Sequence, residues 1–234
     1  MTDHHPREEE RMKRKGHMKR WAGALALALI GLGAAGPAAA QTRLGWYTQI
    51  GPAGIGFSES AKISAGGSTI PGASATLSDN LTLGFGLGYR FSDAFSVIAI
   101  GGLPPTTTIK GTGPLTGITV GKVTYGPLIV AANYHIPTAG KFQPFVGAGV
   151  NYTMVFDAKD GGLTKLKAKS AFGAVLRVGF DYMVSDTDGL FFSANKVFVN
   201  TSATGNAVAL GGAPVSAKIT LDPLILHAGW VHRF

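Results

Sequence analysis

Apolar and polar positions alternate strictly along several segments after residue 40. In the segment 142–156, FQPFVGAGVNYTMVF, every second residue from Phe142 belongs to a wholly apolar set, and the interleaved residues are mostly small or polar. Successive side chains of a strand point to opposite faces, so this segment predicts a strand with one apolar face. Aromatic residues at both ends of that face are typical of a strand that crosses a bilayer, although a soluble strand can alternate in the same way.

The same alternation predicts eight strands after residue 40. The segment 81–91 is as regular as 142–156, with apolar residues set against Thr, Gly and Arg. Eight is also the smallest usual strand number for an outer-membrane barrel. The predicted strands are 43–50, 81–91, 95–103, 118–136, 142–156, 171–183, 190–199 and 224–234.

The connections between these strands alternate in length. The short connections are 92–94, 137–141 and 184–189, and the long ones, rich in Gly, Ser, Thr and Lys, are 51–80, 104–117, 157–170 and 200–217. Outer-membrane barrels alternate in this way, with short turns on the periplasmic side and long loops outside. The pattern therefore predicts that both ends of the barrel chain lie in the periplasm.

The composition agrees with a membrane barrel. Hydrophobic residues make up 45% of the 234 residues and charged residues only 15%. No stretch after residue 40 approaches the ~20 consecutive apolar residues of a membrane helix. A soluble barrel would bury its apolar face and expose the other, but here the other face is small and nearly uncharged. The sequence thus predicts an all-β, eight-stranded antiparallel transmembrane β-barrel, because a closed barrel satisfies every backbone amide within a bilayer.

Residues 1–40 are predicted to be a signal peptide with an extended basic n-region. A basic run ends at Met18-Lys19-Arg20, the segment 21–32 is apolar, and Ala38-Ala39-Ala40 forms a small-residue cleavage site. The barrel would then comprise residues 41–234. An N-terminal membrane anchor is the weaker alternative, because the apolar core is short and no stop-transfer pattern follows it.

Charge and reactive residues exclude several functions. The formal charge is +8, and fourteen Lys and Arg face nine Asp and Glu after residue 40. These basic residues are dispersed, apart from Lys165, Lys167 and Lys169, so nucleic acid is not an expected partner. The chain has no Cys, which excludes disulfides and thiolate metal sites. We expect no cofactor and no metal.

Several motifs resemble those of the OmpW family of bacterial outer-membrane proteins, which includes AlkL. Residues 145–153, FVGAGVNYT, are similar to the family's PYVGAGxNYT, with Phe145 where Tyr is usual. Residues 179–182 (GFDY), 221–223 (LDP) and the C-terminal AGWVHRF also resemble family segments. The resemblance implies an outer-membrane location and uptake of small hydrophobic molecules. The terminal Phe234 resembles the signal that the barrel-assembly machinery reads, with His232 where Tyr is preferred.

Strand direction and side-chain parity sort the inward residues by height. The outer half of the lumen is predicted to be apolar, and Gly147 and Gly149 are interpreted as holding space there, or as packing closely beside bulky neighbours. A charged, hydrogen-bonded plug is predicted near the periplasmic end, with Asp181 paired to an arginine. The apolar set is Ile98, Ile100, Ile129, Val175, Val197 and Ile225, and the polar set is Arg43, Arg90, Asn133, His135, Arg177, Asp181 and Arg233.

The sequence supports one function and leaves rivals open. We expect passive uptake of small hydrophobic molecules through the upper lumen, with lateral exit into outer-membrane lipid, and no enzymatic activity. The resemblance to the OmpW family implies a lumen constriction near Ile100 and Val197. Eight strands can also enclose nothing but a filled core. A structural or adhesive barrel is the alternative, and a lipid-modifying enzyme a weaker one, because no catalytic spacing accompanies His135 or His227.

Overall fold

The computed structural model describes residues 44–138 and 140–234. The predicted signal peptide and Arg43 lie outside the described residues, so both stay predictions. No helix in the described part of the chain is long and apolar enough to cross a membrane.

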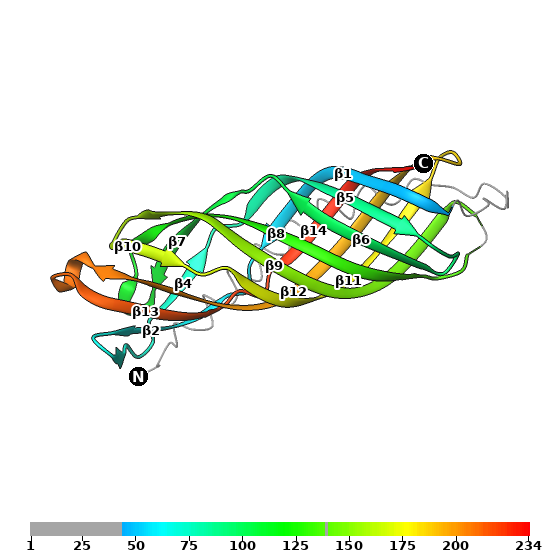
Figure 1. Ribbon diagram of the computed structural model, residues 1–234. Coiled ribbons are helices and arrows are strands. Elements are labelled where there is room, and N and C mark those ends of the chain that lie inside the picture. The colour runs from blue at the N-terminus through cyan, green and yellow to red at the C-terminus, as the bar shows by residue number, and fades with distance from the viewer. Residues whose placement is uncertain (1–43, 139) are drawn as a thin grey trace, which may run out of the picture. The chain divides into compact units, whose positions relative to one another are not determined.

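Eight long strands form a closed ring. Each pairs antiparallel with the next along the chain, and β14 returns to pair with β1 from Arg233 opposite Tyr47 to Leu224 opposite Gly56. In Figure 1, β1 (blue) accordingly lies beside β14 (red). The predicted eight-stranded antiparallel barrel is confirmed. The ring strands are β1 (Gly45–Gly56), β5 (Asn80–Arg90), β6 (Phe95–Gly102), β8 (Thr119–His135), β9 (Phe142–Asp160), β11 (Ala171–Met183), β12 (Asp188–Ala207) and β14 (Leu224–Arg233).

The long connections are themselves largely strand, which the sequence prediction missed. Six shorter strands and two 3-10 helices occupy them. β8 and β12 run on to pair with some of these strands, whereas the extension of β9 pairs with that of β8. Ser, Lys and Gly favour strands weakly, so pairing with a neighbour decided their conformation. The added elements are β2 (Ser60–Ala65), β3 (Ser68–Thr69), β4 (Ser74–Leu77), β7 (Thr106–Thr112), η1 (Gly113–Leu115), β10 (Leu163–Ala168), η2 (Val208–Leu210) and β13 (Ala213–Thr220).

The apolar face of the ring strands points outward, as predicted. In β5, Leu81 is 68% exposed and Leu87 50%, whereas Arg90 of the other face is only 5% exposed. A water-soluble barrel would show the reverse. The exterior therefore suits lipid, and the Gly, Thr and polar side chains line the interior.

Aromatic side chains cluster toward both ends of this apolar exterior. Near the short turns, Trp46 and Tyr89 meet edge to face with ring centroids 5.2 Å apart. Farther from the turns, Tyr152 and Phe172 lie 4.4 Å apart. Aromatic belts at the two interfaces are typical of barrels in a membrane. The exposed band between them is what the alternation in the sequence predicted.

Candidate functional site: an apolar cavity above a polar layer

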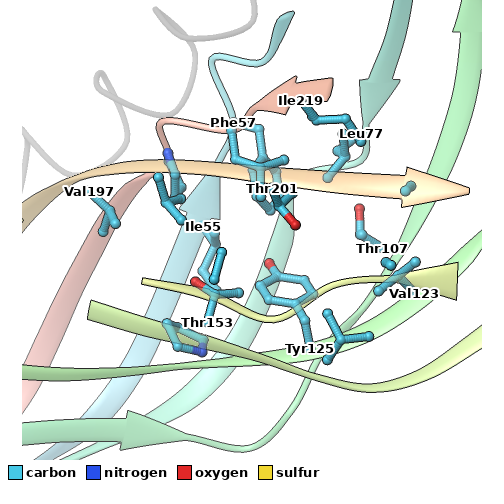
Figure 2. Close-up of a pocket in the computed structure, with 18 of the residues that line it drawn as sticks. Ile55, Phe57, Leu77, Thr107, Val123, Tyr125, Thr153, Val197, Thr201 and Ile219 are labelled. Atoms are coloured by element: carbon cyan, nitrogen blue, oxygen red, sulfur yellow. The ribbon is translucent and has the colours of Figure 1, made fainter. Parts of the chain in front are cut away.

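A cavity of about 70 Å³ lies in the half of the barrel away from the short turns. Its lining is almost entirely apolar and comes from ring strands and added strands together. Figure 2 shows Ile55 of β1, Tyr125 of β8 and Thr201 of β12 directed toward the same space. An apolar cavity with few polar groups is the usual form of a small-molecule site.

The predicted apolar residues divide between two cavities. Val197 and Ile225 line the first cavity, and Ile100, Ile129 and Ile225 line a second of about 30 Å³. The two cavities share Ile55, Pro127 and Ile225, so they adjoin. The remaining predicted residues, Ile98 and Val175, are each only 1% exposed but line neither cavity.

Much of the first cavity's lining escaped the sequence analysis. Leu77, Ile109 and Ile219 belong to the added strands, which were expected to be loops. The alternation of buried and exposed residues along β7, Thr106–Thr112, was a signal that could have revealed this strand. A short alternation within a polar, Gly-containing segment is a weak signal, so the sequence pattern predicts a loop there.

Gly147 and Gly149 lie where two strands approach closely. A Cβ at Gly149 would stand 2.1 Å from the backbone oxygen of Val130, and one at Gly147 would stand 2.6 Å from that of Ala132. Real Cβ atoms do not come so near a neighbouring backbone. Neither glycine lines either of the two cavities. This geometry favours the close-packing interpretation over the interpretation that they hold space in the lumen.

The barrel wall is interrupted beside the second cavity. The β6–β8 ladder ends at Ile100 opposite Ile129, and β7–β8 pairing starts at Thr106 opposite Thr124 with a one-residue change of register. Pro127 lies in this interval and has no backbone N–H to donate to a ladder. Both interior and wall residues line the second cavity, including Asn195, His227, Gly101 and Leu103, so it reaches from the lumen to this interval.

A hydrogen-bonded polar layer fills the interior nearer the short turns. Arg233 donates to the Asp181 carboxylate at 3.1 Å and to Gln143 at 2.7 Å. Arg90 donates to the same Gln143 oxygen at 3.2 Å, and Gln49 donates to Asp181 at 3.3 Å. The predicted pairing of Asp181 with an arginine is thus present, with Arg233 as the partner. Buried charges need such partners, because an unpaired charge in a low-dielectric interior is costly.

Three other predicted polar residues lie in or beside this layer. His135 Nε2 and Ser96 Oγ are 2.9 Å apart, and Asn133 donates to the same hydroxyl at 3.2 Å. Arg177 is 3% exposed and lies over the ring of Phe145, 5.0 Å from its centroid. The sequence does not predict that four further buried residues belong to this layer, because large or neutral side chains do not stand out from an alternating pattern. These residues are Tyr47, Gln49, Ser96 and Phe145.

The layer offers little catalytic or metal-binding chemistry. The His135 Nδ1 atom has no hydrogen-bond partner among the described residues, so no carboxylate orients the ring toward Ser96. Triad chemistry needs such an orienting group. Within residues 44–138 and 140–234, no three His, Asp or Glu are grouped so that they could hold a metal ion.

A closed barrel with an apolar exterior and an inward-facing polar layer is an integral outer-membrane protein. The chain belongs to the OmpW family, whose model matches residues 47–234. It is 40% identical over 180 residues to the Dibenzothiophene metabolism operon protein PahQ of Pseudomonas aeruginosa, covering 77% of this chain and 84% of the relative. It is 30% identical over 177 residues to Outer membrane protein AlkL of Ectopseudomonas oleovorans, covering 75% and 76%. The crystal structure of the outer membrane protein OprG from Pseudomonas aeruginosa superposes with a TM-score of 0.77 at 25% identity, covering 82% of this chain and 97% of OprG.

Proposed function

We propose that the barrel lets small hydrophobic molecules enter from outside the cell and pass into the outer membrane. The observation that carries this proposal is the apolar cavity in the outer half of the barrel, above a polar layer that holds itself together by hydrogen bonds. An apolar solute would gain by leaving water for this cavity. It would not gain by crossing the polar layer, whose ion pair would have to be broken.

The name of one relative indicates the kind of solute. PahQ is described as a protein of a dibenzothiophene metabolism operon. Dibenzothiophene is an apolar, fused aromatic molecule, and a cavity lined by aliphatic side chains with Phe57 and Tyr125 suits such a compound. We therefore propose that the solutes include apolar aromatic molecules.

The interrupted wall between β6 and β8 provides the exit in this proposal. The second cavity adjoins the first and reaches Gly101 and Leu103 at the wall. Leu103 is 57% exposed, so the outer end of this path faces the surroundings of the barrel. A solute leaving here would enter lipid directly, without meeting the polar layer.

Uptake of a radiolabelled apolar solute into cells tests the entry step. Val197→Asn and Ile100→Asn each place an amide in one of the two cavities, and we expect each to lower the uptake rate about tenfold, because an amide buried without a partner is unfavourable. Val208→Asn, on an exposed 3-10 turn, is the matched control and should leave uptake unchanged. Unchanged uptake in both cavity variants, at equal protein levels, would reject the proposed route.

The exit step has its own pair of variants. At both Gly101 and Gly54 a Cβ would meet nothing within 4 Å, so a side chain can be added at either position without a clash at its Cβ. Gly101 lines the second cavity and Gly54 does not. Gly101→Phe should therefore slow uptake several-fold, whereas Gly54→Phe should not. Equal uptake by the two variants would mean that solutes leave elsewhere.

We infer further that the protein transports rather than catalyses, since the Ser96–His135 contact lacks an acidic partner. A purified barrel with esterase activity that His135→Ala abolishes would contradict this inference.

The C-terminal strand is the proposed contact with the barrel-assembly machinery. Phe234 is 62% exposed, and its backbone N–H donates to Trp46 of the first strand at 3.0 Å. Its ring lies edge to face with that of His232, 4.9 Å between centroids, and its exposed surface is the part that would contact the machinery. Phe234→Ala should reduce the assembled fraction in cells, and normal assembly of that variant would contradict the proposal.

A further inference from the structure

Beyond Thr153, one edge of β9 has no strand paired with it. β9 pairs with β8 as far as Asp160, but its pairing with β11 ends at Thr153 opposite Ala171. The following strand, β10, pairs with β12 instead of β9. The β10 segment therefore closes the wall between β9 and β12, but no continuous ladder joins β9 to β10. Figure 1 shows β10 at this position.

Side-chain contacts fix the β10 segment across this edge. Asp160 accepts hydrogen bonds from the backbone N–H groups of Lys165 and Leu166, both at 2.9 Å. These donors, Leu166 first, hold the pKa of the Asp160 carboxyl below its ordinary value. The Val155 N–H donates to Ser170 Oγ at 3.0 Å. The segment is thus held at both ends, with an open stretch between.

A hollow of about 460 Å³ occupies this stretch. Its lining comes from β9, from β10 with Lys169 directly after it, and from β12. Three of its residues, Val155, Ala168 and Lys169, also line the apolar cavity inside the barrel. The hollow and the cavity therefore adjoin at these residues, and we interpret the hollow as a side entrance to the lumen.

The charges around this side entrance are arranged by depth. Lys169 is the one charged residue among those that line the apolar cavity, and it also lines the hollow. Lys167 and Asp157 line the hollow only. In the described part of the chain, neither lysine ammonium forms an ion pair with a carboxylate. A lysine without a carboxylate partner in the described residues thus lies among those where the hollow and the cavity adjoin.

We propose that this entrance binds apolar carboxylic acids, with the carboxylate at Lys169 and the apolar part in the cavity. Lys167 adds a second positive charge, and the hydroxyls of Ser202 and Thr204 are further donors in the hollow. A carboxylate accepts hydrogen bonds from an ammonium strongly, and the apolar part is removed from water at the same time. This inference rests on the proposed function, since it assumes that the cavity accepts apolar solutes.

Binding of octanoate and octanol at pH 8 separates the two ideas. The protein is reconstituted in nanodiscs of zwitterionic lipid, and binding is measured by equilibrium dialysis against empty nanodiscs. Lys169→Gln removes the charge but keeps a polar stem, and we expect it to weaken octanoate binding about three- to fivefold, the range of a partly exposed ion pair. Octanol binding should change less than twofold. Lys169→Arg should retain most of the octanoate affinity.

Lys110→Gln is the matched control, because β7 is separated from β10 by β8 and β9. It should affect neither ligand. Added salt should weaken octanoate binding to the unaltered protein and to Lys110→Gln more than to Lys169→Gln. If octanol binds but Lys169→Gln leaves octanoate affinity unchanged, the entrance proposal is wrong and the proposed function stands. If neither ligand binds above the empty nanodiscs, the proposed function itself fails. If Lys169→Gln weakens binding of a phosphate-bearing lipid and not of octanoate, the hollow is a lipid headgroup site instead.

Discussion

The two halves of the barrel interior differ although the exterior is similar along its length. The outer half leaves a cavity among aliphatic side chains, and the half near the short turns is filled by side chains that bond one another, centred on Asp181, Gln143 and Arg233. A hydrogen bond restricts the distance and angle between its two groups, whereas a contact between aliphatic side chains restricts their relative positions less. In the proposed function, the polar layer would supply stability and a barrier, and the apolar half would supply the route.

The largest expected effect comes from breaking the polar layer. Asp181→Ala leaves the buried Arg233 without its carboxylate, so we expect a loss of about 3–5 kcal/mol in the free energy of unfolding. Urea unfolding in micelles measures this loss. Asp157→Ala, on the exposed edge of β9, should change stability by less than ~0.5 kcal/mol. At a temperature where Asp181→Ala is still folded, solute uptake should persist. An Asp181→Ala variant as stable as the Asp157→Ala control would show that the layer is not a structural unit.

The second-largest expected effect on stability comes from adding a methyl group at Gly149, where β9 lies close to the backbone of β8. Gly149→Ala places a Cβ against the backbone of β8, and we expect it to cost about 1–3 kcal/mol through forced backbone movement. Gly101→Ala, where the Cβ meets open space, is the control and should be nearly neutral. If Gly149→Ala were neutral in stability but lowered uptake, the glycine would be holding lumen space after all.

A smaller effect is expected at the exposed counterpart of the buried ion pair. Asp188 lies 2.7 Å from His232 Nδ1 and accepts a hydrogen bond from Trp230, but these side chains are partly exposed. Asp188→Asn should therefore cost no more than about 1 kcal/mol, well below Asp181→Ala. The same unfolding measurement serves both variants. Equal costs for the two would mean that burial does not explain the strength of the polar layer.

The smallest effect should be confined to the β10 segment. The lowered pKa of Asp160 means that its charged form is favoured by the folded β10 segment. The stabilisation is present above the ordinary aspartate pKa and is lost as pH falls through the lowered folded value. NMR shifts of the Lys165 and Leu166 amides should report this transition. Asp160→Asn should remove it while global unfolding stays unchanged, and a titration that persists in that variant would assign it to another group.

The sequence predicts the strands of the barrel wall more fully than it predicts the contacts in the lumen. All eight ring strands were found, and β11 (Ala171–Met183) matches its predicted limits, because alternation repeats with the two-residue period of a strand. The predicted segments for β1 and β12 end too early. β1 continues to Gly56 by pairing with β5 and β14, and β12 continues to Ala207 by pairing with β10 and β13, which are distant in the sequence. Parity also predicted which side chains face inward, including Arg90, Asp181 and Arg233, all at most 5% exposed.

By itself, then, the sequence determined the barrel, its outward apolar face and the polar character of one end. These follow from local periodicity, which a single strand carries in its own residues. Only the tertiary structure decided that Arg233 is the partner of Asp181, that Gly149 serves a close approach, and that Lys169 lies where hollow and cavity meet. Each of these depends on which strands become neighbours and in what register, and pairing between strands is set by the closed ring as a whole.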